Sequence, residues 1–332
     1  MSVAVAAAPK RSSWPSRPTD DHGARTIATR EARATKLGAA LGDLVGDPSA
    51  FAAALKAAFA ELADPEYRAG QAFVAPGIGP THGVRTPLQV AVRRAFQRAS
   101  RRTSLAQLLS IADRLLREPE REARWFAITT LERTIAPEPE RTWQLLRRAA
   151  RDADDWITID TLAHPCGKGI LAEAYRWAEL EQLTISPSRW ERRLVGSTIA
   201  TMPYVNRSAG RDPSVAAIAL GILGTLIGDA EPDVQKALSW AYRSMALVDQ
   251  AATTEALAAE ARTAAETGDG HRAWVIRDSL QKLDPDAAAA IREQLTGIRR
   301  SATAPATSKA AALAEQFAGM GLGRPMPEPP LT

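Results

Sequence analysis

The sequence predicts an all-α fold, in which HEAT-like helical repeats stack into a curved solenoid. Apolar residues recur at steps of three and four through nearly all of residues 26–298, while the alternating pattern of a β-strand is almost absent. Proline, glycine and Asp-Pro pairs divide this region, with about 40 residues to each pair of helices. An irregular helical bundle is the alternative interpretation. A solenoid has a concave side, which arginine-rich helices would make a basic groove suited to a duplex.

Proline marks the start of several predicted helices. Residues 105–116 place leucines on one helical face, and Pro119 then ends that helix and opens the next. Proline suits a first turn because its φ is already helical and its missing N–H would have no partner there. Later helices show the same signal, with proline before Trp143, Trp190 and Val234. We expect about twelve to fifteen helices of about 10–17 residues.

Two terminal segments differ in composition from the middle. Residues 1–25 are rich in Pro, Ser and Ala, and residues 300–332 are rich in Ala, Gly and Pro. Such segments have little apolar surface to bury. We therefore expect a disordered tail at 1–25, a helical repeat domain at 26–298 and a flexible tail at 299–332. A short helix is expected at 309–317 within the last of these.

Composition excludes several classes of site and location. A lone cysteine, Cys166, excludes a disulfide framework and, with His164, supplies too few ligands for a zinc site. No glycine-rich phosphate loop occurs. The longest apolar stretch, residues 215–227, is too short to span a bilayer, and the N-terminal apolar hexamer precedes the charges, unlike a secretory signal. We expect a monomeric cytoplasmic protein with no metal, no nucleotide cofactor and no membrane contact.

Arginine is concentrated in one part of the chain. The whole sequence carries a formal net charge of +4, but residues 85–151 contain 15 arginines and seven acids, a local charge of +8. This asymmetry predicts an anionic partner. Arg93, Arg94 and Arg98 share one face of a helix, where they could contact successive phosphates. An ordinary solvated arginine surface is the alternative.

A tryptophan and an aspartate form the most specific cluster. Trp156 and Asp160 are four residues apart and so share one face of a helix. Asp155 is suited to cap the start of that helix. In a basic groove the indole would pack on a sugar or base, and the carboxylate would stabilise a developing cation. The alternative is a core tryptophan beside a solvated acid. The residues that could join the cluster are Trp190, Arg193, Lys236 and Trp240. The tryptophans interpreted as core are Trp125, Trp143, Trp177 and Trp274.

These motifs resemble a known family. The order Trp156-x-x-x-Asp160, Trp190-x-x-Arg193 and Gln235-Lys236-Ala-Leu-x-Trp240 is that of the AlkD family of HEAT-like-repeat DNA glycosylases. Upstream, Gly83-Val-Arg85-Thr86-Pro87 looks like the turn that opens a DNA-facing helix in that family, and Pro119-Glu-Arg-Glu122 is similar to its next repeat. The resemblance covers about residues 60–295.

The resemblance implies an activity and a set of site residues. Enzymes of this family remove N3- and N7-alkylated purines, whose alkylation leaves the base positively charged. It implies that Asp160 is the catalytic carboxylate and that Trp156 and Trp240 pack around the sugar-phosphate of the lesion. Arg193 would hold the DNA backbone. The residues expected to contact DNA are Arg85, Arg93, Arg94, Arg192, Lys236 and Arg272.

The implied reaction is hydrolysis of the N-glycosidic bond in duplex DNA, without a metal and without base flipping, to leave an abasic site. Such an enzyme would be associated with the nucleoid. Two other hypotheses stay open: a non-catalytic DNA-binding repeat protein, and a solenoid whose arginine face binds an acidic protein.

Overall fold

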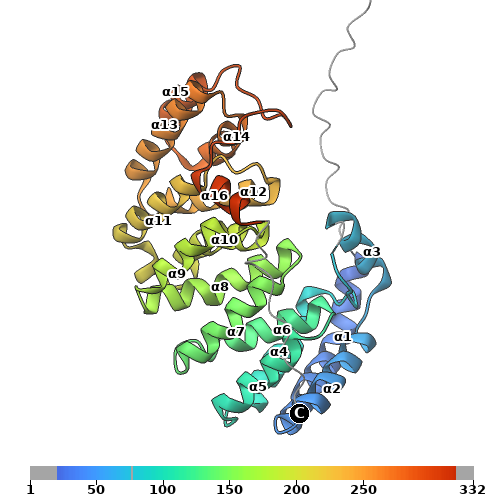
Figure 1. Cartoon of the computed structure of the whole chain (residues 1–332). Helices are drawn as coiled ribbons and strands as arrows, with labels where there is room; N and C mark the ends of the chain where they lie inside the picture. The colour runs from blue at the N-terminus through green and yellow to red at the C-terminus, as the bar shows by residue number, and fades with distance from the viewer. Residues whose placement is uncertain (1–20, 76–77, 319–332) are drawn as a thin grey trace, which may run out of the picture.

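The computed structural model of the chain describes residues 21–75 and 78–318. These residues form sixteen α-helices and four short 3-10 helices, and they contain no strand. Figure 1 shows the helices stacked one after another along a curved path, with α3 standing apart from the C-terminal helices across the open side. The predicted all-α solenoid is confirmed, and the irregular bundle is not what the chain forms.

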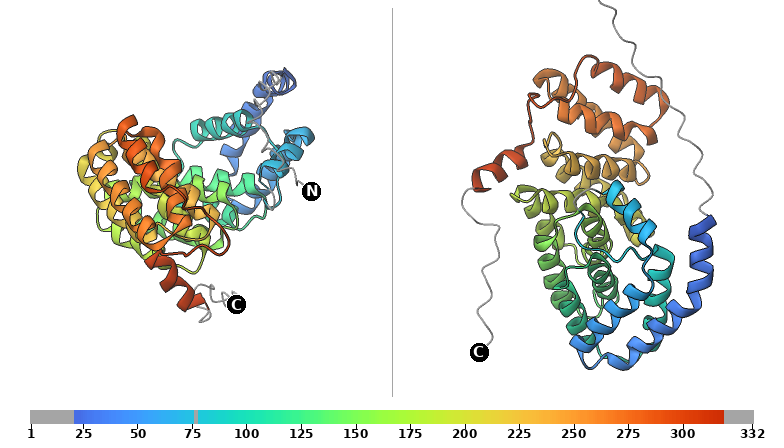
Figure 2. Two further views of the ribbon diagram at one scale, coloured as in Figure 1. Left: turned by 90° about the horizontal axis from the view of Figure 1, so that it is seen from above. Right: turned by 90° about the vertical axis from the view of Figure 1, so that its right-hand side faces the viewer.

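The helices that matter most for function form one layer of the stack, which we call the inner helices. The inner helices are α4 (Thr86–Ala99), α6 (Arg121–Leu131), α8 (Trp156–Ala172), α10 (Arg189–Val205), α12 (Pro232–Met245) and α14 (Gly270–Ser279). The outer helices between them are α5 (Leu105–Leu116), α7 (Pro139–Asp152), α9 (Arg176–Gln182), α11 (Pro213–Leu226) and α13 (Gln250–Thr267). The remaining α-helices are α1 (Asp21–Ala40), α2 (Pro48–Glu61), α3 (Pro65–Val74), α15 (Pro285–Gln294) and α16 (Lys309–Ala318). Figure 2 shows the same stack from above and from the side.

Helix starts follow the signals in the sequence. Proline stands in the first turn of α2, α3, α4, α7, α11, α12 and α15. Asp155 caps α8 as predicted, since its carboxylate accepts from the backbone N–H of Thr158 at 2.8 Å. Buried side chains then join neighbouring repeats, as where Phe96 of α4 packs between Phe51 of α2 and Phe126 of α6. Trp143, interpreted as core, is buried.

The inner helices share a register that sets out two rows of side chains. Residues four apart lie on one face of a helix, so the fifth and ninth residues of each inner helix face the same way. We call the fifth residues the fifth-residue row: Val90, Trp125, Asp160, Arg193, Lys236 and Trp274. The ninth residues form the ninth-residue row: Arg94, Thr129, His164, Ser197, Trp240 and Asp278. Three residues of each row, Val90, Trp125 and Asp160 of the first and Thr129, His164 and Trp240 of the second, line one groove, which is described below.

The helical domain extends past its predicted bounds. At one end α1 begins at Asp21, inside the segment expected to be a tail. At the other end the expected helix at 309–317 is present as α16, which packs against α11 and the 3-10 helix η2 (Leu183–Ile185). The boundaries at 26 and 298 were therefore drawn too narrowly. The rest of both predicted tails, residues 1–20 and 319–332, lies outside the described residues. Over the described part of the chain, no helix combines the length and the apolar character needed to cross a membrane.

Candidate functional site

Asp160 is held in place by side chains from the next inner helix. Nε of Arg193 donates to Oδ1 of Asp160 at 3.1 Å, and Nη2 donates to Oδ2 at 2.8 Å, so the pair is bidentate. Oγ of Ser197 also donates to Oδ1 at 2.6 Å. Arg193 and Ser197 are the fifth and ninth residues of α10, directly beside the fifth residue of α8. The carboxylate keeps 22% of its side-chain surface exposed, so one edge of it faces the groove.

Arg193 is bound within the protein. Its Nη1 donates to the carbonyl oxygen of Asp233 at 2.7 Å, in addition to the two bonds to Asp160. The guanidinium lies 5.8 Å from the ring centroid of Trp156, and the residue is only 5% exposed. A bidentate arginine fixes both the position and the plane of a carboxylate. The geometry therefore makes Arg193 an orienting partner of Asp160, and it leaves little of the guanidinium to reach the DNA phosphate expected for it.

Three tryptophans stand around Asp160. Trp125, Trp156 and Trp240 are half-buried and line one open groove of about 450 Å³ together with Asp160. Trp156 and Trp240, which were predicted to come together, both line this groove. The other residues that line it are Val90, Arg93, Thr129, Glu132, Ile157, Thr161 and His164. The groove thus brings three indoles together with the carboxylates of Asp160 and Glu132.

Trp125, interpreted as a core residue, packs against the core but also lines the groove. It is the fifth residue of α6, the position that Asp160 occupies in α8, and the guanidinium of Arg93 lies over its ring at 5.5 Å from the centroid. Nε of Arg93 is buried and has no hydrogen-bond partner within the described part of the chain. The sequence signal for Trp125 is its position in its helix. Trp125 lies four residues after Arg121, the first residue of α6, just as Asp160 lies four residues after Trp156, the first residue of α8.

A second cavity adjoins the first across Trp156 and Ile157. It has about 530 Å³ and is bounded on the far side by α3, with Arg85 in its wall. Arg85 is held there, because its Nε donates to Oδ2 of Asp64 at 2.7 Å and its guanidinium lies 5.2 Å from the ring centroid of Tyr67. Burial alone would raise the pKa of Asp64, but hydrogen bonds from Arg85 and two backbone N–H groups lower it below its usual value.

The two upstream sequence motifs meet in the turn before α4. Glu122, which is fully buried, accepts hydrogen bonds from Oγ1 of Thr81 at 2.6 Å and from the backbone N–H of Gly83 at 2.8 Å. Gly83 has a φ of +77°, a conformation that glycine adopts readily and other residues avoid. Burial alone would raise the pKa of Glu122, but the hydrogen bond from Thr81, the charge of Arg121 and backbone N–H groups lower it below its usual value. The turn that places Arg85 is therefore fixed by the motif of the following repeat.

Three of the cations predicted to bind DNA lie on or beside the two rows. Arg94, the ninth residue of α4, and Lys236, the fifth residue of α12, are exposed. Arg93 is half-buried on Trp125 at the groove. These three cations therefore come from α4 at one end and α12 at the other.

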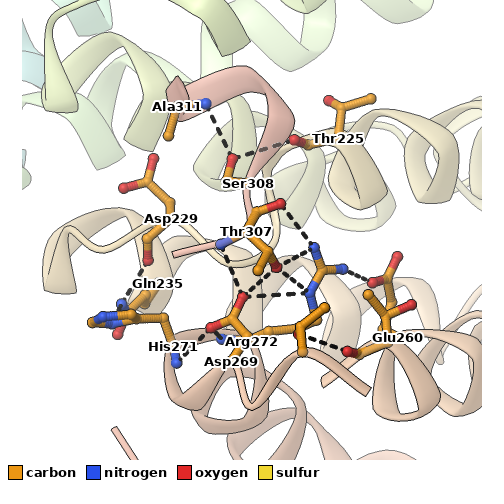
Figure 3. A network of polar contacts seen from close by, with 12 residues as sticks. Thr225, Asp229, Gln235, Glu260, Asp269, His271, Arg272, Thr307, Ser308 and Ala311 are labelled. Atoms are coloured by element: carbon orange, nitrogen blue, oxygen red, sulfur yellow. Dashed lines mark hydrogen bonds and ion pairs between the residues drawn. The ribbon is translucent and has the colours of Figure 1, made fainter. Parts of the chain in front are cut away.

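The structure holds two of the predicted DNA-contact residues, Arg192 and Arg272, in buried ion pairs. Arg192 is 7% exposed: its Nε donates to Asp229 at 2.7 Å and its Nη1 to the carbonyl oxygen of Ser186 at 2.8 Å. Arg272 is 5% exposed and pairs with Glu260 and Asp269 in the network of Figure 3. Arg192 is the fourth residue of α10 and Arg272 is the third residue of α14. These positions point away from the fifth and ninth residues, so both side chains pack against neighbouring segments instead of facing the groove.

Arg192 is expected to act on stability. Arg192→Ala would leave Asp229, which is 1% exposed, as a buried charge without its partner. Breaking such a pair costs about 3–5 kcal/mol, so the free energy of unfolding should fall by that order in urea titrations. Arg94→Ala, which removes an exposed arginine of the ninth-residue row, is the control and should unfold as the wild type does. A stable Arg192→Ala protein with weakened duplex binding would contradict this assignment.

The described residues form a helical-repeat protein whose inner helices carry a carboxylate, indoles and cations on one side. Residues 55–283 match the family described as DNA alkylation repair enzyme. The chain belongs to that family, as the resemblance to the AlkD glycosylases implied, and its partner is DNA. The matched segment contains every predicted site residue, from Arg85 to Arg272. A comparison with curated proteins gave no match.

Proposed function

We propose that the protein is a DNA glycosylase that hydrolyses the N-glycosidic bond of cationic N3- or N7-alkylated purines in duplex DNA and leaves an abasic site. The observation that carries the proposal is Asp160, which is oriented by three hydrogen bonds from Arg193 and Ser197 and lines a groove together with three indoles. Membership of an alkylation repair family gives the kind of damage. The groove residues give the chemistry.

The chemistry needs few groups because the alkylated base is already a cation. The bond between C1′ and the base nitrogen breaks with its electron pair going to the base, which leaves as a neutral purine. A positive charge then develops on the sugar, as in other glycosyl cleavages, and a carboxylate close to C1′ stabilises it. Water adds to C1′ and its proton passes to Asp160 or to solvent. No step requires a metal or a nucleotide.

The arrangement around Asp160 supports this role. Arg193 and Ser197 bond to both carboxylate oxygens, so the free edge of Asp160 keeps one direction toward the groove. A group held in its working orientation loses no free energy to reorganisation when charge appears on the sugar. Within this proposal Arg193 is a positioning residue, and Asp160 is the residue that faces the reacting sugar.

The tryptophans and the cations would hold the duplex. Each indole face attracts a cationic base or sugar by about 0.5–2 kcal/mol, depending on how much water is excluded. The groove is open, which fits a lesion that stays in the helix more closely than one drawn into an enclosed pocket. Arg93, Arg94 and Lys236 would contact phosphates on the two sides of Asp160. We propose a monomer at the nucleoid as the working form.

The experiment is release of free base from duplex DNA by the purified full-length protein. Duplexes that carry 7-methylguanine, 3-methyladenine or a bulky cationic N3-alkyladenine are incubated with the protein, and the supernatant is analysed for free base against a buffer control for spontaneous loss. We expect release from at least one of these substrates above the control. Duplex binding without release of any of them would sink the glycosylase proposal and favour a non-catalytic DNA-binding protein.

A further inference from the structure

A C-terminal segment outside the family-matched residues crosses the end of the inner layer. We call residues 299–308 the strap; they connect the turn after α15 to α16, while the family match ends at residue 283. Figure 1 shows this dark orange to red part of the chain passing α14 before it reaches α16. The strap is therefore an addition to the part of the chain that defines the family.

The strap is fixed at its far end by a buried polar network. Asp269 accepts from the backbone N–H of Thr307 at 3.1 Å and from its Oγ1, and Arg272 donates to the same hydroxyl at 3.0 Å (Figure 3). Oγ of Ser308 donates to the carbonyl oxygen of Thr225 at 3.3 Å. Ser308 is 2% exposed and Asp269 is fully buried. Arg272, which was expected to bind DNA, instead anchors the strap.

The near end of the strap crosses α14 at a glycine. A Cβ atom on Gly270, the first residue of α14, would lie 2.1 Å from the carbonyl oxygen of Arg299 and 2.8 Å from Cα of Arg300. Both contacts are to backbone, which cannot swing aside as a side chain can. The course of the strap over α14 therefore depends on the absence of a side chain at residue 270.

This course brings Arg300 onto the fifth-residue row. Its guanidinium lies 4.9 Å from the ring centroid of Trp274, the fifth residue of α14, and its Nη1 donates to Oε1 of Gln235 at 2.8 Å. Gln235 directly precedes Lys236, the exposed cation that comes before Trp274 in the row. Arg300 itself is exposed. The positive charge of Arg300, which does not belong to the inner helices, therefore follows that of Lys236 along the fifth-residue row.

The neighbouring acid does not cancel this charge. Asp278, the ninth residue of α14, is paired with Arg243, whose Nη1 lies 2.5 Å from its carboxylate, and it also accepts from Oγ of Ser239 at 2.7 Å. Arg300 is therefore presented to solvent beside an acid that already has a cationic partner. Its stacking on Trp274 and its bond to Gln235 limit the conformations of a side chain that would otherwise be mobile.

We propose that Arg300 is a DNA-binding residue, which the strap holds against a backbone phosphate of the duplex on the α14 side of the site. The proposal rests on the proposed function only in taking duplex DNA to lie along the inner helices. It adds one phosphate contact beyond those of the repeats. The proposal also assigns a role to the strap. The strap would supply a cation at α14, whose own residues in the two rows, Trp274 and Asp278, carry no positive charge.

The test measures duplex binding by the full-length protein as salt is varied. Arg300→Gln removes the charge and retains a hydrogen-bonding side chain; we expect it to weaken binding several-fold and to reduce the slope of log Kd against log salt by about 0.9, the value for one phosphate. Arg300→Lys should keep most of the affinity. Arg262→Ala, which removes an exposed arginine from α13 in the outer layer, should bind as the wild type does.

A second variant tests the strap without removing any charge. Gly270→Ala should displace the strap and reproduce the loss seen with Arg300→Gln, because its methyl group cannot share space with the Arg299 carbonyl. On a duplex whose single lesion fixes the register, removing the base pairs on the α14 side of the lesion should abolish the difference between wild type and Arg300→Gln, whereas removing those on the α4 side should not. Wild-type affinity and salt slope in Arg300→Gln would overturn the proposal. A wild-type protein that binds duplex and loses affinity on Arg300→Gln, but releases no base, would leave the strap proposal standing and defeat only the glycosylase proposal.

Discussion

Asp160→Asn is expected to lower base release by about 10²–10³-fold, the usual effect of removing one group that stabilises charge in a transition state. The amide can still bond to Ser197, but it carries no negative charge to place beside the developing sugar cation. Duplex affinity should stay the same or rise, since an acid near the phosphates is lost. Single-turnover excision from an alkylated duplex gives the first quantity, and anisotropy of a labelled duplex gives the second.

The chain offers a matched control for this substitution. Asp278 is also held by an arginine and a serine of the adjacent inner helix, Arg243 and Ser239. It belongs to α14, however, two inner helices beyond α10, the helix that holds Asp160. Asp278→Asn should therefore excise at the wild-type rate. Wild-type excision by Asp160→Asn, or equal losses in the two variants, would remove Asp160 from the reaction.

Arg193→Gln is expected to lower the single-turnover rate by about 10²-fold while it leaves duplex affinity nearly unchanged, because a carboxylate that loses its partner no longer keeps its working direction. The fold should also lose about 2–4 kcal/mol, less than a fully buried pair would, since Asp160 is partly exposed. Excision at saturating protein, equilibrium binding and urea unfolding separate these three effects.

The opposite pattern would restore the role that the family resemblance implied for Arg193. If Arg193→Gln bound duplex more weakly, with a shallower salt dependence, and still excised at the wild-type rate when saturated, then the arginine would be a phosphate ligand. Ser197→Ala should follow Arg193→Gln in direction with a smaller loss, because Oδ1 of Asp160 would still accept from Nε of Arg193.

Much of the fold could be predicted because helix signals are local. Proline at the first turn and aspartate at the cap act within a few residues, which is why the start of α12 at Pro232 and the cap of α8 by Asp155 could be predicted. The shared face of Trp156 and Asp160 also follows from a step of four. The short helix α16 was expected within a segment whose composition predicts a flexible tail, and nothing in its own sequence indicates that it packs on α11.

What could not be predicted concerns side chains whose partners lie far away in the chain. Arg192 looks like a phosphate ligand until folding brings Asp229, 37 residues further on, to its Nε. Trp125 has the apolar neighbours of a core residue, and only the stacking of α4 beside α6 shows that one face of it lines the groove. The position of a residue within its helix predicts which way it points. It does not predict which charge will meet it there.

The common register of the inner helices also governs where the chain can change in length. One residue inserted before the fifth position of an inner helix would turn that side chain by about 100° and remove it from the groove. The same insertion in an outer helix or a turn would leave both rows in place. The spacing already varies in this way, with 33 residues from Asp160 to Arg193 and 43 from Arg193 to Lys236. Insertions and deletions among relatives should therefore gather in the outer helices and turns, while the first nine residues of each inner helix keep a constant length.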